Sequence, residues 1–205
     1  MTQPSPPGSL RRRSLLLRAL GVAASRLAPV WGAAASGLGA ATSVRAAEAE
    51  LINLEIHRDE DGVYLGYAVE FDLGRSVDDA LVKSVPIFFV TEAEVYRDRW
   101  YWRDRRVARA LRSWRIVYQP LTSTYRVTTV GGLSQNYATR DEAMVALSRS
   151  ARWKVAEPGQ IEEGSRHYVE FQYRLDTAQL PRPMQIGISG EPDWQLSVRR
   201  TVRIS

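Results

Sequence analysis

Cysteine is absent from the 205 residues of this chain. Its absence excludes disulfide bonds, a thiolate nucleophile, cysteine-ligated zinc or iron–sulfur sites, and a cysteine for lipid attachment. A domain without disulfides depends on its hydrophobic core, and a chain of this length can bury a core of sufficient size. With 44% hydrophobic and 25% charged residues, the composition is that of a soluble globular protein. We expect one domain preceded by a leader.

Histidine is nearly absent, and the other common site motifs are missing. His57 and His167 lie far apart in the sequence, and a metal site would need them to converge with a carboxylate. Both lie at expected strand ends, so we expect both to be exposed. Residues 59–62 resemble part of a calcium loop, but Ala68 stands where that loop needs a glutamate. No phosphate-binding glycine loop is present, and we predict no metal, no cofactor and no catalytic residue.

Acidic residues are absent from the first 46 positions. That segment holds six of the 28 Lys and Arg residues, which leaves 22 against all 23 Asp and Glu residues in the remainder. The net charge of +5 and the pI near 9.7 therefore come from the leader, and residues 47–205 carry a net charge of −1. A nearly neutral domain gives no reason to expect a nucleic-acid partner.

The N-terminal segment predicts an export signal. A basic cluster precedes a stretch rich in Ala, Gly and Leu, and Val44 and Ala46 give the small-x-small pattern of a signal-peptidase site. We expect cleavage after Ala46 or Ala47 and a periplasmic protein. Arg12 and Arg13 before a serine and leucines resemble a twin-arginine signal. The alternatives are an uncleaved leader that anchors the protein to the inner membrane, although residues 27–44 are marginal for a span, and a misassigned start with cytoplasmic residence.

Apolar residues alternate with polar ones over most of the remaining chain. Strands with one solvent-exposed face are expected at 63–72, 168–175 and 194–204, and a solvent-exposed face favours antiparallel pairing. The pair Asp61-Gly62 predicts a hairpin turn after the first strand, because glycine supplies the positive φ that such turns need. Further strands are expected at 51–57, 87–96, 109–119, 125–130 and 133–137.

Two capping boxes predict short helices. Ser76 and Thr139 are each followed three residues later by a carboxylate, so we expect helices that end near Lys83 and Arg149. The segment Leu180–Pro183 is expected to be extended. Together these elements indicate a mainly β (α+β) fold over residues 47–205. It is a single antiparallel β-sandwich or curved-sheet domain with two short helices.

Arginine and aromatic residues are concentrated in residues 96–115, which hold eight arginines together with Tyr96, Trp100, Tyr101 and Trp102. One interpretation is two strands joined by a turn at residues 100–105, with a solvated charged outer face and Trp114 toward the core. The other is a contact surface for an acidic protein or a membrane, since Arg, Trp and Tyr carry most binding hot spots. The candidate contact residues are Arg99, Trp100, Trp102, Arg103, Arg105 and Arg106.

A pair of acids precedes this stretch. Glu92 and Glu94 are two residues apart and would share a strand face. Were that face buried, each carboxylate would raise the pKa of the other. We expect the face that carries both glutamates to be exposed to solvent instead.

Four ordered motifs carry a resemblance to a known family. They are RWYW at 99–102, YQPLTSTYRV at 118–127, GGLSQ at 131–135 and LDTAQLPRPMQ at 175–185. The chain resembles a proteobacterial family of exported proteins known as domain of unknown function 4390. The resemblance implies an N-terminal signal and an accessory role linked to membrane signalling. It implies no activity, cofactor or catalytic residue.

Three functions stay open at this point. The first is a non-enzymatic binding or accessory module of the cell envelope, with an envelope protein or the membrane surface as its partner. The second is a carrier of a small ligand or lipid in an apolar pocket enclosed by the sheet. The third is an enzyme of unfamiliar type.

Overall fold

The computed structural model describes residues 49–129 and 131–204. The predicted leader and its predicted cleavage site therefore lie outside the described residues. These residues belong to one compact unit, and the buried core residues lie between Val63 and Leu196. A chain that begins at Ala47 consequently retains the whole described core. Within the described ranges, no helix is both long and apolar enough to span a membrane.

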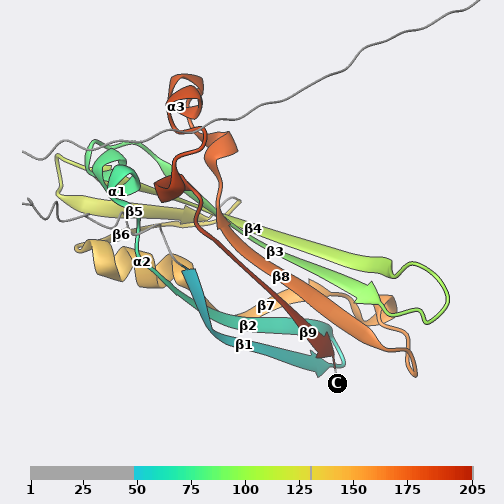
Figure 1. Ribbon diagram of the computed structural model, residues 1–205. Helices are drawn as coiled ribbons and strands as arrows, with labels where there is room; N and C mark the ends of the chain where they lie inside the picture. Colours follow the sequence, from blue (N-terminus) through green and yellow to red (C-terminus); the bar gives the residue numbers. More distant parts are fainter. Residues whose placement is uncertain (1–48, 130, 205) are drawn as a thin grey trace, which may run out of the picture. The chain divides into compact units, whose positions relative to one another are not determined.

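Two antiparallel β-sheets form a sandwich (Figure 1). The smaller sheet has the order β1-β2-β7 and consists of β1 (Ala49–Asp59), β2 (Gly62–Phe71) and β7 (Arg149–Ala156). The larger sheet has the order β6-β5-β4-β3-β8-β9. Its strands are β3 (Ile87–Arg97), β4 (Arg105–Gln119), β5 (Thr124–Thr129), β6 (Ser134–Tyr137), β8 (His167–Leu175) and β9 (Ser197–Ile204).

Short helices join the sheets and cover their ends. They are α1 (Arg75–Val82), α2 (Arg140–Ser148) and α3 (Arg182–Gly187), with the 3-10 turns η1 (Pro158–Gln160), η2 (Thr177–Gln179) and η3 (Pro192–Trp194). Helix α2 packs against β5 and β6, where the smaller sheet does not reach, and α1 packs against η3. The smaller sheet is closed against the larger one by contacts of β1 with β9 and of β7 with β4.

The core fills the space between the sheets with alternate residues of each strand. In β8 the odd-numbered residues from His167 to Leu175 are buried and the even-numbered ones are half-buried. Tyr67 of β2 meets Phe171 of β8 at 5.0 Å between ring centres, and Phe89 of β3 stacks on Tyr173 at 5.8 Å. Strict period-two alternation therefore specifies which face is inside.

The predicted fold class is confirmed, and all eight predicted strands are present with ends shifted by a few residues. The predicted hairpin is also present, but its turn residues are Glu60 and Asp61, and Gly62 is the first residue of β2. Glycine is required there, because Gly62 has φ +137° and a Cβ would lie 2.3 Å from the Ala156 carbonyl oxygen. The last strand begins at Ser197 rather than at Trp194, which is buried in η3.

One strand and one α-helix were not predicted. Strand β7 follows α2 directly, and its signal is short because only Trp153 and Val155 alternate with exposed basic residues. Helix α3 occupies residues 182–187, so the prediction of an extended Leu180–Pro183 segment is wrong at its second half. Proline is tolerated in the first turn of a helix because the N–H it lacks there has no acceptor within the helix.

One of the two predicted capping boxes is correct. The Thr139 hydroxyl accepts from the Glu142 N–H at 3.3 Å, and the Glu142 carboxylate accepts from the Thr139 N–H at 3.3 Å. Helix α1, however, begins at Arg75 with Gly74 as its N-cap, and Ser76 does not cap it. The N–H of Ser76 donates instead to the carboxylate of Asp193 at 2.9 Å, so this helix start is satisfied from a distant part of the chain.

Candidate functional site

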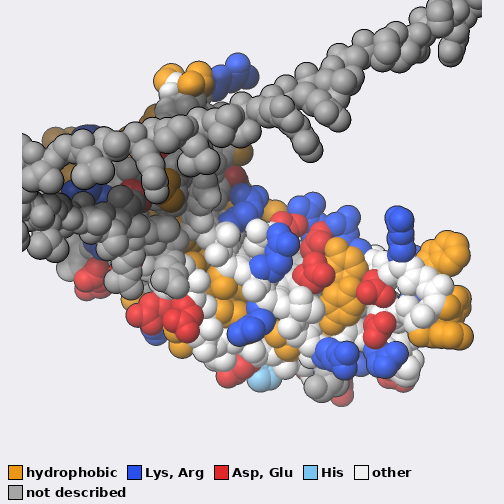
Figure 2. Space-filling view, viewed as in Figure 1, with side chains coloured by type: hydrophobic (Ala, Val, Ile, Leu, Met, Phe, Trp, Pro, Cys, Tyr) orange, Lys and Arg blue, Asp and Glu red, His pale blue; other side chains and the backbone are white. Residues whose placement is uncertain are grey.

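The loop between β3 and β4 carries the most exposed group of aromatic side chains. Trp100, Tyr101 and Trp102 are 86%, 72% and 70% exposed, and we call these three residues the aromatic tip. Trp100 and Tyr101 pack edge to face with ring centres 5.0 Å apart. Figure 2 shows hydrophobic side chains gathered at the end of the molecule where this loop lies in Figure 1. None of the three rings belongs to the hydrophobic core of the described residues or to the side chains packed against it.

Two acidic residues hold the base of this loop. Asp104 accepts from the Arg99 N–H at 3.0 Å and from the Tyr168 hydroxyl at 2.8 Å. Asp98 pairs with Arg166 at 3.5 Å, and its backbone N–H donates to the Arg166 carbonyl at 2.9 Å. Both carboxylates therefore point toward β8 and its preceding loop, and the aromatic tip extends beyond them.

The structure brings the six predicted contact residues to one end of the β3–β4 hairpin but does not make them equivalent. Trp100 and Trp102 form the tip together with Tyr101, which was not among the candidates. Arg103 and Arg105 are exposed and form no ion pair among the described residues. Arg99 is half-buried. Arg106 lies further along β4 and is paired with Glu94, so it is part of a different group.

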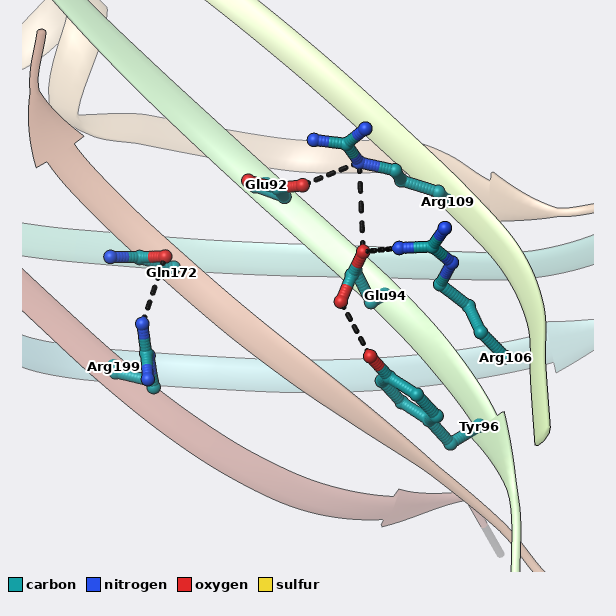
Figure 3. Close-up of polar contacts among 7 residues, drawn as sticks. All are labelled: Glu92, Glu94, Tyr96, Arg106, Arg109, Gln172 and Arg199. Atoms are coloured by element: carbon teal, nitrogen blue, oxygen red, sulfur yellow. Dashed lines mark hydrogen bonds and ion pairs between the residues drawn. The ribbon is translucent and has the colours of Figure 1, made fainter. Parts of the chain in front are cut away.

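That group is a ladder of charges on the outer face of the larger sheet (Figure 3). Arg109 donates to Glu92 at 2.5 Å and lies 3.6 Å from Glu94, and Arg106 donates to Glu94. We call Glu92, Glu94, Arg106 and Arg109 the charged ladder. The side chains of both glutamates are only 18% exposed. The face that was predicted to be exposed to solvent is therefore exposed chiefly through its arginine side chains.

Glu94 is held as a carboxylate by its neighbours. The Tyr96 hydroxyl donates to it at 2.6 Å, and this bond, with the two arginines, keeps the pKa of Glu94 below its ordinary value of 4.5. The same hydrogen bond raises the pKa of Tyr96 to about 12, and burial adds to that shift. A carboxylate that is ionised and already hydrogen-bonded is poorly suited to donate a proton in catalysis.

Strands β8 and β9 extend the same face. Tyr168 stacks on Tyr96 with ring centres 5.3 Å apart, and Arg199 donates to Gln172 at 3.3 Å. A hollow of about 130 Å³ lies between Glu92, Glu94, Glu170 and Arg199. It is too small for an organic substrate, since ligand pockets are typically ~300 Å³ or larger. The paired charges here stabilise a sheet surface.

The two histidines have different surroundings. His57 is exposed, as predicted, and lies 3.4 Å from Glu55. His167 was also expected to be exposed, but it is 4% exposed and its Nδ1 lies 3.0 Å from the Ser165 carbonyl oxygen. It lies on the inner face of β8, where alternation with Val169 could have indicated burial. The two lie in different sheets, and among the described residues no three His, Asp or Glu side chains form a possible metal site.

Ligand-sized space lies outside the sandwich. A groove of about 500 Å³ on the outer face of β4 and β5 is lined by Arg115, Val117, Leu121 and Arg126, among others. The space between the sheets is filled by the aromatic residues of the core. A carrier whose sheet encloses an apolar pocket stays a prediction, and this filled interior does not favour it.

Comparison with known proteins identifies the family alone. No curated protein and no solved structure matches the chain. The family model described as a domain of unknown function, DUF4390, matches residues 46–204. The motifs on which the resemblance rests lie in the β3–β4 loop, the β4–β5 hairpin, the start of β6 and the segment from β8 to α3. This chain belongs to the DUF4390 family.

Proposed function

We propose that the chain is a non-enzymatic binding module of the cell envelope whose contact surface is the aromatic tip with Arg103 and Arg105. The observation that carries the proposal is the exposure of three consecutive aromatic side chains at 70% or more. Burial of each ring would contribute roughly 1.5–3 kcal/mol of stabilising free energy, which the isolated domain does not gain. Exposed apolar groups of this kind mark interaction sites.

The hairpin is built in a way that suits a contact role. Strands β3 and β4 pair from Ile87–Ile116 to Arg97–Arg105, so the tip rests on a long, rigid ribbon. Asp98 and Asp104 hold the base of the loop through β8. A contact on such a support costs little ordering entropy, because the backbone that carries it is already fixed.

The predicted export signal supports a place in the envelope. The basic leader and its small-x-small site motivate a periplasmic location, and the family resemblance motivates an accessory role near membrane signalling. N-terminal sequencing of the protein from cells is expected to begin at Ala47 or Glu48. A protein that begins at Met1 and fractionates with the cytoplasm would contradict the proposed location.

Capture from envelope extract tests the contact surface. A chain that begins at Ala47 is immobilised, and components retained by wild type are compared with those retained by W100S/Y101S/W102S. The matched control is L121S/L133S, which replaces two other exposed loop residues, 101% and 91% exposed. We expect wild type and the control to retain at least one envelope component, protein or lipid, that the tip variant loses. Identical retention by all three would overturn the proposal.

A further inference from the structure

We propose that the aromatic tip docks on the surface of an anionic phospholipid bilayer. This inference rests on the proposed function and names the partner of the same surface. It is drawn from the shape of the loop, the chemistry of its side chains and the placement of charge around it.

The shape of the tip is convex. Strand β8 pairs with β3 only as far as His167 opposite Arg97, so residues 98–104 extend past the last strand pair of that neighbour, as Figure 1 shows. A standard protein interface uses ~800 Å² from about 20–30 residues on each side. Three rings on a projecting loop supply less than that as a flat surface. A fluid bilayer, in contrast, surrounds a projecting loop on all sides.

The side chains of the tip suit the polar boundary of a bilayer. Trp and Tyr combine an apolar ring with an N–H or O–H group, and both are enriched at the level of the lipid headgroups. Residues 98–104 contain no aliphatic side chain, only these aromatics with Asp98, Arg99, Arg103 and Asp104. We therefore expect shallow insertion and not penetration of the hydrocarbon.

The positive charge around the aromatic tip favours an anionic lipid as its partner. Arg103 and Arg105 are exposed and form no ion pair among the described residues, while the carboxylates of Asp98 and Asp104 are engaged at the base of the loop. A basic side chain near an anionic membrane contributes about 1 kcal/mol of attraction. Arg103 and Arg105 therefore supply the electrostatic part of the contact, and salt is expected to weaken it.

Acidic residues on neighbouring loops limit the contact to the tip. The turn at residues 59–62 and the segment 157–166 lie at the same end of the sandwich, because β2 pairs with β7 from Val63–Ala156 onward and β8 begins at His167. These segments carry Glu60, Asp61 and Glu163, which are exposed and form no ion pair among the described residues. An anionic surface repels them, so the domain would meet the bilayer through the hairpin rather than through its whole end.

Vesicle flotation tests the inference. The chain from Ala47 is mixed with vesicles of phosphatidylcholine alone or with one quarter phosphatidylglycerol, in low and physiological salt. Wild type and L121S/L133S are expected to float with the anionic vesicles. W100S/Y101S/W102S should lose at least about tenfold in partition, and R103S/R105S should lose the preference for phosphatidylglycerol.

Tryptophan fluorescence gives an independent reading of insertion. Among the described tryptophans Trp114, Trp153 and Trp194 are 5% exposed, so a blue shift on adding vesicles reports Trp100 and Trp102. Cooperative urea unfolding of every variant shows that the fold is intact.

The outcomes separate the inference from the proposed function. Failure of wild type to bind anionic vesicles, or equal binding by the tip variant, would overturn the lipid assignment. If capture of an envelope protein still depends on the tip, the binding module stands with a protein as its partner. If neither lipid nor protein binding depends on the tip, both proposals fall.

Discussion

Tyr67 and Tyr173 place two hydroxyl groups in the middle of an apolar core, with different surroundings. The Tyr67 hydroxyl lies 3.2 Å from the Thr91 hydroxyl. Tyr173 is 0% exposed, and its hydroxyl has no hydrogen-bond partner among the described residues. Burial raises the pKa of Tyr173 well above its ordinary value of 10.0, so the group stays neutral. A buried polar atom without a partner costs free energy that a hydrogen-bonded one does not.

Removing each hydroxyl should therefore have opposite effects. We expect Y173F to raise the free energy of unfolding by about 1 kcal/mol, because the change removes an unsatisfied group. Y67F should lower it by about 1 kcal/mol and leave Thr91 without its partner. Urea denaturation at neutral pH measures both. A destabilised Y173F would show that the Tyr173 hydroxyl has a partner such as a bound water.

Single residues also show where sequence reasoning was incomplete. The prediction of Trp114 toward the core is confirmed, since Trp114 is 5% exposed. His167 follows the alternation of buried and half-buried residues along β8. Its exposure was predicted instead from its residue type and from its place at a strand end, and that prediction is wrong. Burial there follows from the pairing of His167 with Ile204 and Arg97 on the two flanking strands, and that pairing is a property of the sheet.

At the scale of elements, α1 shows how a helix start can depend on a distant segment. Gly74 precedes the helix, and a Cβ at this position would lie 2.5 Å from the Asp193 Cβ. The close approach lets the Asp193 carboxylate accept from the Ser76 N–H and face the positive end of the helix. Ser76 has the residue type of a cap, but the packing of η3 on α1 supplies the cap from elsewhere.

Substitution of Asp193 tests this arrangement. D193A should lower the free energy of unfolding by about 1 kcal/mol, the usual cost of losing an N-terminal cap. The matched control is E191A, since Glu191 is exposed in the same segment. Thermal or urea unfolding compares the two, and equal stability of both variants with wild type would show that the Asp193 cap contributes nothing.

Across the whole molecule, acid stability depends on carboxylates in different places. The pKa is lowered for Glu94 chiefly by the Tyr96 hydroxyl and for Glu55 chiefly by the Asn53 amide. Hydrogen bonds and Arg174 outweigh burial to lower the pKa of Asp176. A carboxylate with a lowered folded pKa stabilises the fold fully above its unfolded value, and this contribution is lost as the pH falls through the folded value. Stability should therefore decline on acidification from about pH 4.5 downward.

The charged ladder should account for part of that decline. E94Q is expected to lower the free energy of unfolding by about 1 kcal/mol at pH 7, because Arg106 and Arg109 lose a charged partner. The difference from wild type should shrink as the pH falls through the lowered folded pKa of Glu94, where the wild-type carboxylate becomes protonated. E163Q is the control, because Glu163 is exposed on a loop. A constant difference between wild type and E94Q at every pH would contradict this account.

The sequence by itself determined the class of fold, the position of most strands, one helix cap and the family, because these depend on local alternation, turn residues and motif order. It also placed the arginines and aromatics of residues 96–115 on a hairpin. Only the tertiary structure decided which of them are available for contact. Arg106 forms an ion pair with Glu94. The carboxylates of Asp98 and Asp104 are held by residues near 166–168, and the side chains of Trp100, Tyr101 and Trp102 are left exposed. Those differences come from pairing across strands that are far apart in the chain, and no local pattern encodes such pairing.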